Sequence, residues 1–242
     1  MSLFKKKNKV SKKRKGIIVS ESNVNLGING FTRLKDNVLF LNSEGNCKVL
    51  QIESSVAREG KTTVACNLAV SLGFTEKKVL IVDLDFRRPR VHRHFNLGKE
   101  KGLAEYMKGE LTKEEIIKKT TYENVDILTR GEEIYNSSIV LCSATFIDLI
   151  AQLRNNYDYI ILDCPPVLQV SDYIHIAKVS DGVLLMVAHA KTTKAQIGET
   201  VKELNYKNIK ILGTVFTMYN RATYKSYYHS YNSYEYGDNK EG

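Results

Sequence analysis

The sequence lacks three patterns that would place the chain in familiar classes. Its four cysteines are widely separated and form no C-x-x-C pair, which argues against a disulfide framework or a zinc site and for reduced thiols. No apolar run approaches the roughly 18 to 20 residues that span a bilayer. The N-terminal segment has no apolar stretch of the kind found in a signal peptide. We therefore expect a cytoplasmic protein.

Positive charge is concentrated near the N-terminus. The formal net charge is +9, and residues 1–20 are interpreted as a flexible basic arm. Such an arm can be simply solvated, or it can bind anionic lipid headgroups or nucleic acid, and its composition does not choose among these. The basic residues of its first fifteen positions are Lys5, Lys6, Lys7, Lys9, Lys12, Lys13, Arg14 and Lys15.

Short apolar runs alternate with helical patterns after residue 45, and residues 21–45 are expected to mix helix and loop. Several runs are continuously apolar, which is typical of strands buried on both faces of a parallel sheet. The pattern predicts an α/β domain over residues 21–218, built as a three-layer sandwich around a mostly parallel sheet. The predicted strands are 48–54, 78–85, 125–129, 157–166, 181–189 and 210–218.

Residues 219–242 contain no valine, leucine or isoleucine, so we expect them to be disordered. Tyrosine is nevertheless abundant there. Polar residues separate the rings, which have no apolar partner to pack against, so the tail calls for an explanation other than a core. Its tyrosines between residues 224 and 236 are Tyr224, Tyr227, Tyr228, Tyr231, Tyr234 and Tyr236.

The first predicted strand runs into the sequence SVAREGKTT and then into a helix predicted for residues 64–73, with Gly73 as its C-cap. A strand, a G-K-T triplet and a helix in this order are typical of a phosphate-binding loop. N–H groups and the dipole at a helix N-terminus favour bound phosphate. Lys61 is expected to reach the β and γ phosphates and the Thr62 hydroxyl to bind Mg²⁺. The predicted nucleotide-binding residues are Ser55, Val56, Ala57, Arg58, Glu59, Gly60, Lys61, Thr62 and Thr63.

Two other apolar strands end in aspartates. Asp83 and Asp85 follow the strand at 78–85, and Asp163 follows the strand at 157–166. Ligands bind at the carboxyl ends of strands in open α/β sheets, so these carboxylates should share one Mg²⁺-nucleotide site with the loop. Arg87 is expected to stabilise a transferring phosphoryl group. The predicted metal ligands are Thr62, Asp83, Asp85 and Asp163.

Together these motifs resemble those of the bacterial tyrosine kinases, or BY-kinases, of capsule and exopolysaccharide clusters. The family has a degenerate Walker A loop, matched by residues 54–62, and a D-x-D-x-R motif, matched by residues 83–87. It has a Walker B motif of the form D-x-P-P, matched by residues 163–166, and a C-terminal tyrosine cluster. The resemblance covers about residues 30 to 236.

The resemblance implies a P-loop NTPase fold of the MinD and ParA type, with ATP and Mg²⁺ as cofactors. It implies an enzyme that phosphorylates its own C-terminal tyrosines, one subunit acting on the tail of the next, and that controls polysaccharide synthesis and export. By the same resemblance, the catalytic residues would be Lys61, Asp83, Asp85, Arg87 and Asp163.

The resemblance also implies partners. A separately encoded membrane activator, the polysaccharide co-polymerase, would bind the chain through its cytoplasmic segment and hold it at the inner face of the cell membrane. Further copies of the chain, in a ring or a trans dimer, and a cognate tyrosine phosphatase are also expected. The basic arm would then contact anionic lipid, and nucleic acid is not an expected partner.

The sequence departs from the family pattern in three places. Ala57-Arg58 stands where Pro-Gly is common in the loop. The E-x-x-R-x-x-R pattern of the family's ring contact aligns with Asn29, Thr32 and Lys35. The last strand ends in Phe216-Thr217 and has no asparagine of the kind that contacts adenine in related ATPases.

Two other functions compete with the kinase hypothesis. An ATPase of the MinD or ParA type would share the fold, but its signature lysine is replaced here by Val56, and such proteins lack tyrosine-rich tails. A catalytically weak adaptor would fit the unusual Arg58, and its tail would be phosphorylated by another kinase.

Overall fold

The computed structural model describes residues 17–19 and 26–219. The predicted arm (1–20) and tail (219–242) lie almost wholly outside the described residues. The helices are α1 (Leu26–Leu41), α2 (Lys61–Gly73), α3 (Val91–His94), α4 (Leu103–Met107), α5 (Lys113–Ile116), α6 (Ser137–Cys142), α7 (Ala144–Asn156), α8 (Asp172–Ile176) and α9 (Lys194–Tyr206). The strands are β1 (Val49–Ser54), β2 (Val79–Asp83), β3 (Ile117–Lys119), β4 (Val125–Leu128), β5 (Tyr159–Asp163), β6 (Gly182–Ala188) and β7 (Ile211–Thr217).

The strands of the described residues form one sheet in the order β3-β4-β2-β5-β1-β6-β7. Every neighbouring pair is parallel except β3 and β4. The six predicted strands are all present, and β1, β2, β4, β5 and β6 are buried at every residue. The prediction of a mostly parallel sheet buried on both faces is therefore confirmed.

The edge strand β3 was not predicted. Its three residues follow α5 directly and are only partly buried, so they carry neither an apolar run nor an alternation that marks a strand. Antiparallel pairing with β4 gives them their extended form, and Lys119 Nζ bonds to Asp126 Oδ2 across the pair at 2.8 Å.

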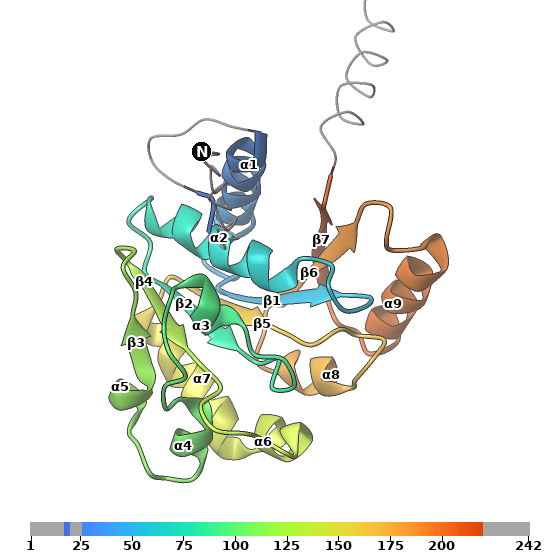
Figure 1. Cartoon of the computed structure of the whole chain (residues 1–242). Coiled ribbons are helices and arrows are strands. Elements are labelled where there is room, and N and C mark those ends of the chain that lie inside the picture. The colour runs from blue at the N-terminus through green and yellow to red at the C-terminus, as the bar shows by residue number, and fades with distance from the viewer. Residues whose placement is uncertain (1–16, 20–25, 220–242) are drawn as a thin grey trace, which may run out of the picture.

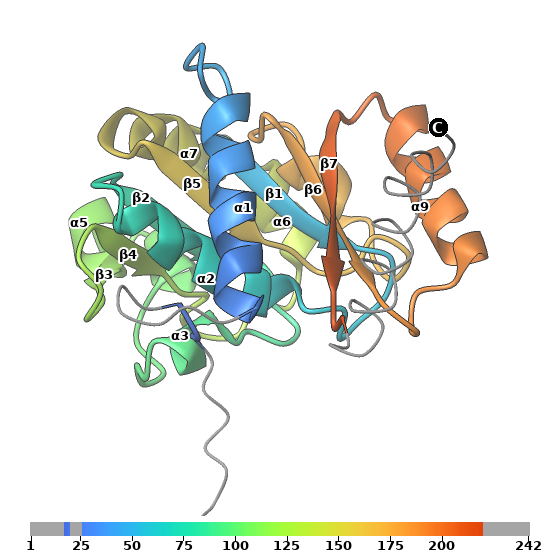
Figure 2. The same cartoon turned by 90° about the horizontal axis from the view of Figure 1, so that it is seen from above.

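Helices cover both faces of the sheet, which makes the predicted three-layer sandwich (Figure 1). On one face, α1 and α2 pack over the central strands, and Figure 2 shows α1 lying across them. On the other face, α7 and α8 pack against the same strands, and α9 packs against β6. Consecutive residues of one strand enter opposite cores: Leu50 and Ile52 face α2, whereas Val49 faces α7.

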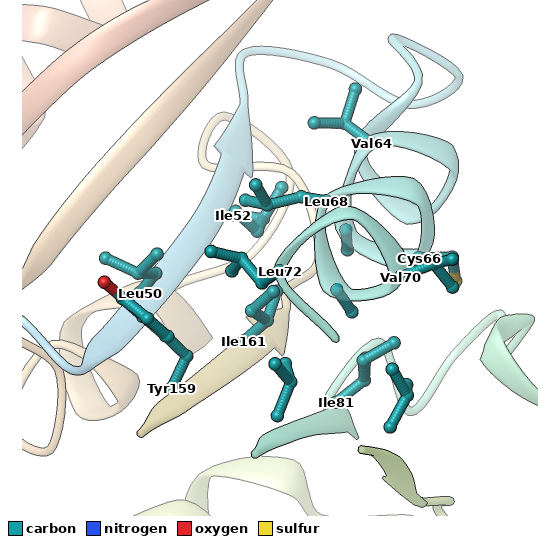
Figure 3. Close-up of a cluster of buried hydrophobic side chains, with 14 of the residues drawn as sticks. Leu50, Ile52, Val64, Cys66, Leu68, Val70, Leu72, Ile81, Tyr159 and Ile161 are labelled. Carbon is teal, nitrogen blue, oxygen red and sulfur yellow. The ribbon is translucent and has the colours of Figure 1, made fainter. Parts of the chain in front are cut away.

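The α2 face is a dense aliphatic core. Leu68 and Leu72 of α2 lie over Ile52 and Ile161 of β1 and β5, and all four side chains are fully buried (Figure 3). Complete burial of a leucine or isoleucine contributes about 1.5 to 3 kcal/mol to stability. This packing fixes α2, and with it the loop that precedes α2, against the carboxyl ends of the central strands.

The expected role of Gly73 as a C-cap is wrong. Gly73 is the last residue of α2, and Phe74 takes the C-cap position with a right-handed φ of −64°. A Cβ at Gly73 would lie 2.8 Å from Val125 Cγ2 and 2.9 Å from the Glu123 carbonyl oxygen. Glycine is needed there because the helix end packs directly against the start of β4.

No helix in the described part of the chain combines the length and the apolar character needed to cross a membrane.

Candidate active site

The predicted phosphate loop joins β1 to α2 at the carboxyl edge of the sheet. The helix begins at Lys61, one turn earlier than predicted, so Lys61, Thr62 and Thr63 belong to its first turn. Gly60 precedes the helix with φ +94°, a left-handed conformation that favours glycine. No acidic side chain occupies the first turn of α2, so its N–H groups and the helix dipole are available to an anion.

Lys61 is buried, and its ammonium group donates a hydrogen bond to Ser54 Oγ at 2.8 Å. Ser54 in turn donates to the Val56 carbonyl oxygen at 2.8 Å. The Lys61 side chain therefore folds back to the end of β1, where Ser54 holds its ammonium group. The sequence singled out Lys61 but not Ser54, whose role depends on where the lysine side chain folds back.

The two strand-end aspartates lie side by side. Asp83 is directly opposite Asp163 in the β2–β5 register, and both side chains are buried. The Thr62 hydroxyl donates to Asp163 Oδ2 at 2.6 Å. The backbone N–H groups of Arg90 and Val91 donate to Asp83 Oδ2 at 2.9 and 3.0 Å. The fold therefore brings Thr62, Asp83 and Asp163 together at the carboxyl edge of the sheet.

Each of these aspartates keeps one buried oxygen without a hydrogen bond, Oδ1 in both cases. Burial raises the pKa of Asp163 to about 7, against the lowering effects of the Thr62 hydroxyl and the Lys61 charge. Burial, and then the Asp163 charge, raises the pKa of Asp83 well above its usual range. Two buried carboxylates of like charge with unpaired oxygens are costly unless a cation neutralises them.

Asp85 and Arg87 lie further out. Asp85 is partly exposed, and its Oδ1 accepts a hydrogen bond from the Arg88 N–H at 3.0 Å. Its charge raises the pKa of both Asp83 and Asp163, so it lies near the pair. The Arg87 side chain is exposed and lines a cleft beside the carboxylates.

The residues present fit a bound Mg²⁺. The unpaired Asp163 Oδ1 belongs to the carboxylate that accepts the Thr62 hydroxyl bond, and Asp83, with its own unpaired oxygen, stands opposite it on β2. Carboxylate and hydroxyl oxygens are the donors that Mg²⁺ takes. Within the described residues, no group of three His, Cys, Asp or Glu side chains could hold a metal by itself. Mg²⁺ commonly binds one or two carboxylates and completes its shell with phosphate oxygens and water.

Contacts from the β6–α9 loop hold the phosphate loop from outside. Lys191 Nζ donates to the carbonyl oxygens of Ala57 and Arg58, at 2.7 Å each. Glu59 is buried and accepts hydrogen bonds from the Val56 N–H, at 3.2 Å, and from the Thr192 hydroxyl. Sequence reasoning missed Lys191 and Thr192 because they lie more than 130 residues from the loop. Glu59 was expected among the nucleotide-binding residues, and in the structure its carboxylate ties the loop together.

Ser55 and Glu53 complete the buried polar surroundings of the loop. Ser55 Oγ accepts from the Thr200 hydroxyl of α9 at 2.8 Å. Glu53 lies beneath the loop with its Oε1 bonded to Gln51 Nε2 at 2.7 Å. Burial raises the pKa of Glu53 to about 8. No motif marked Glu53, since a carboxylate inside an apolar strand has no spacing signature.

Arg58 occupies a backbone conformation that suits glycine. Its φ is +64°, and its side chain is exposed. A left-handed conformation costs an L-residue about 1 to 2 kcal/mol. The loop therefore accommodates the arginine by directing its side chain to solvent, at the cost of local backbone strain.

The Arg58→Gly variant is expected to increase the free energy of unfolding by up to about 1 kcal/mol, since relief of the left-handed strain is partly offset by the greater chain entropy of glycine. Urea denaturation followed by circular dichroism would measure the change. Arg58→Ala is the matched control, because it removes the same charge and retains the strained conformation. Equal stability of the two variants would contradict this explanation.

The structure shows the surroundings of the two other departures from the family pattern. The Thr217 hydroxyl donates to the Glu59 carbonyl oxygen at 2.6 Å, so it is occupied within the protein. On α1, Asn29 and Thr32 are exposed, whereas Lys35 is half-buried and pairs with Asp36 at 3.1 Å. The three positions that align with the family's ring-contact pattern thus lie on α1, and the one basic residue among them, Lys35, is engaged locally.

Comparison with known proteins identifies the family. The chain is 31% identical over 201 residues to the putative tyrosine-protein kinase CapB of Staphylococcus aureus, covering 83% of this chain and 88% of that protein. The chain belongs to the BY-kinase family. It is also 30% identical over 210 residues to the tyrosine-protein kinase YwqD of Bacillus subtilis (strain 168), with 87% and 89% covered. Against the tyrosine-protein kinase ptk of Acinetobacter johnsonii, the BY-kinase chain is 29% identical but spans only 30% of that protein.

Solved structures agree with this assignment. The chain superposes on the chimerical protein CapA2B2 with a TM-score of 0.78 and 30% identity, covering 83% of this chain and 88% of that one. The septum site-determining protein MinD of Pyrococcus horikoshii, solved with Mg-ADP, matches with a TM-score of 0.59 and 27% identity over 69% of each chain. Residues 48–212 also match the model of the AAA domain family. The BY-kinase therefore has the predicted P-loop NTPase fold with MinD-like neighbours.

Proposed function

We propose that this BY-kinase is an ATP-dependent protein-tyrosine kinase that phosphorylates its own C-terminal tyrosine cluster and thereby regulates capsule or exopolysaccharide synthesis and export. The observation that carries the proposal is the pair Asp83 and Asp163, each with an unpaired buried oxygen, beside Thr62 at the start of α2. This arrangement supports binding of a Mg²⁺-nucleotide with its phosphates on residues 55–63.

The chain's own groups would divide the work of phosphoryl transfer. The N–H groups of the first turn of α2 and the Lys61 ammonium would hold the β and γ phosphates. Thr62 and Asp163 would hold Mg²⁺, which when bound neutralises charge on the transferring group. A protein of the same fold, MinD of Pyrococcus horikoshii, was solved in complex with Mg-ADP, which supports binding of a Mg²⁺-nucleotide by this fold. Arg87, on the exposed side, would approach the transferring group as it gains charge.

A tail tyrosine would be the acceptor. Its hydroxyl has an ordinary pKa near 10, so it carries its proton at neutral pH. As the tyrosine oxygen bonds to the γ phosphorus and the bond to the leaving ADP oxygen breaks, the proton would pass to Asp83 or Asp85.

The proposed partners follow from the family. A membrane activator would engage the chain through its cytoplasmic segment and keep it at the inner face of the membrane, where the basic arm would meet anionic lipid. Copies of the chain would act on one another in a ring or a trans dimer, and a cognate tyrosine phosphatase would reset the tail. Each added phosphate carries about −1.5 to −2 charges, so phosphorylation strongly changes the charge of the tail.

Incubation of the full chain with ATP and MgCl₂, with and without the activator's cytoplasmic segment, would test the proposal. Mass spectrometry of the tail peptides is expected to find phosphotyrosine in the wild type and none in Lys61→Met, which keeps the fold but loses the phosphate-binding charge. Absence of phosphotyrosine even with the activator segment would refute the kinase. Membrane-stimulated ATP hydrolysis without tyrosine labelling would instead favour a MinD-type ATPase, and absence of Mg²⁺-dependent ATP binding would favour an adaptor.

A further inference from the structure

A strongly basic cleft lies beside the proposed catalytic carboxylates, and of its cationic lining residues only Arg87 has a role in the function proposed above. Its volume is about 340 Å³. It lies between the loop that follows β2 and the loop that follows β4, and the segment before α4 closes one side. Its cationic lining residues are Arg87, Arg88, Arg90, Arg93, Lys99 and Arg130.

The positive charge of this cleft is only partly balanced by the protein, since the Arg90 charge lowers the pKa of the neighbouring Asp163. Among the described residues, none of the six cations lies within ion-pair distance of a carboxylate. The lining contains one carboxylate, Glu100, which pairs with Lys118 outside the set at 3.9 Å. Arg130 is held in place by a 2.7 Å hydrogen bond from Nη1 to the Phe86 carbonyl oxygen. Cations gathered without partners repel one another, and a multiply charged anion would relieve that repulsion.

The cleft and the phosphate loop lie on opposite sides of the carboxylates. Along the carboxyl edge of the sheet, β1 carries the phosphate loop, β5 and β2 carry Asp163 and Asp83, and β4 leads into Arg130. The carboxylates therefore separate the phosphate loop from the cleft. The backbone N–H groups of Arg88 and Arg90 bond directly to Asp85 and Asp83, so the cleft begins within one side-chain length of the carboxylates. A substrate that approaches the γ phosphate from this side passes over the cations.

We propose that this cleft binds a phosphotyrosine of a second copy's tail and so positions the next tyrosine for phosphorylation; the inference rests on the proposed kinase function. Arginine binds phosphate through paired N–H donors and is suited to a dianionic phosphotyrosine. Three steps within the cluster, Tyr224 to Tyr227, Tyr228 to Tyr231 and Tyr231 to Tyr234, are three residues long. Three extended residues span about 10 Å, which suits one phosphate in the cleft and the next hydroxyl at the carboxylates.

The consequence is a kinase that phosphorylates several tyrosines of one bound tail in succession. A first phosphate held in the cleft makes each later tyrosine an intramolecular substrate at high effective concentration. Multiply phosphorylated tails should therefore accumulate before the singly phosphorylated pool is large. The uneven spacing of the cluster also predicts that tyrosines three residues from an existing phosphotyrosine react before the others.

A binding titration tests the site without any need for catalysis. A fluorescent peptide of residues 224–236 that carries phosphotyrosine at Tyr231 is expected to bind the full chain at least about tenfold more tightly than the unphosphorylated peptide. The double variant Arg93→Ala with Lys99→Ala should lose that preference. The control, Lys178→Ala with Lys202→Ala, removes the same charge from exposed positions outside the cleft and should retain it.

A second measurement follows the order of phosphorylation by intact-mass spectrometry. The cleft variant should form the first phosphotyrosine at about the wild-type rate but pass mainly through singly phosphorylated tails. Equal affinity for the two peptides, or a preference that both double variants keep, would overturn the site. Loss of binding to phosphatidylserine vesicles in the cleft variant, without any phosphopeptide preference in the wild type, would overturn it in favour of a lipid surface. A phosphopeptide preference in a chain that forms no phosphotyrosine would support the cleft and contradict the proposed kinase function.

Discussion

The Asp163→Asn variant is expected to form tail phosphotyrosine at least about 100-fold more slowly than the wild type, a loss of the size seen when a charge-stabilising group is removed from an active site. The amide keeps the shape of the side chain and can still accept the Thr62 hydroxyl bond, observed at 2.6 Å. It cannot neutralise Mg²⁺ as the carboxylate does. Quantitative phosphotyrosine detection over a range of MgCl₂ concentrations would measure the loss.

The same substitution is expected to stabilise the protein in the absence of metal. Burial raises the folded-state pKa of Asp163 to about 7, whereas the unfolded chain has an ordinary value near 3.9. Between these values the folded state binds more protons, so this group's contribution to stability falls as pH rises from about 4 to above 7. At pH 8, Asp163→Asn should therefore unfold with a free energy higher by on the order of 1 to 3 kcal/mol.

Thermal unfolding with and without MgCl₂ and a nucleotide analogue separates the two effects. The wild type should gain stability with Mg²⁺-nucleotide, and Asp163→Asn should gain much less. Asp148→Asn is the matched control, because it removes one exposed carboxylate on α7 and should change neither quantity. An Asp163→Asn protein that keeps both its activity and its Mg²⁺-dependent stabilisation would contradict the assignment of this carboxylate to the metal.

The Gly102→Ala variant is expected to lower the free energy of unfolding by about 3 kcal/mol or more, at the severe end of overpacking. A Cβ at this position would lie 2.2 Å from the Thr129 carbonyl oxygen and 2.9 Å from the Gly131 nitrogen. Neither backbone atom can withdraw, because the Leu103 and Ala104 N–H groups bond to the carbonyl oxygens of Thr129 and Arg130 at 2.9 and 2.8 Å. The start of α4 lies too close to the end of β4 for any side chain.

Circular dichroism during heating would show the effect as a melting temperature lower by roughly 6 °C or more. The control is Gly198→Ala in α9, where nothing lies within 4 Å of an added Cβ. Alanine in a helix should stabilise that position by about 0.5 to 1 kcal/mol. A Gly102→Ala protein within 1 kcal/mol of the wild type would show that the contact between α4 and β4 can relax.

Much of the fold could be predicted from local sequence patterns. The apolar runs that became β1, β2, β4, β5 and β6 are buried on both sides, and burial on both sides is what removes alternation from a strand. The phosphate loop and the two aspartate motifs were visible because each is a short local motif at the end of such a run. Strand β3 was not visible, because its extended form comes from pairing with β4 and not from its own three residues.

The candidate site, like the fold, could be predicted only in part from the sequence. The sequence by itself determined the candidate groups, Lys61, Thr62, Asp83 and Asp163, since a motif fixes which residue types stand at a strand end. Only the tertiary structure decided that Asp83 and Asp163 stand opposite each other on neighbouring strands and that each keeps one oxygen without a hydrogen bond. It also decided that Lys191 holds the phosphate loop and that cations from three segments meet in one cleft. Such groupings depend on strand order and loop packing, which no stretch of the chain contains by itself.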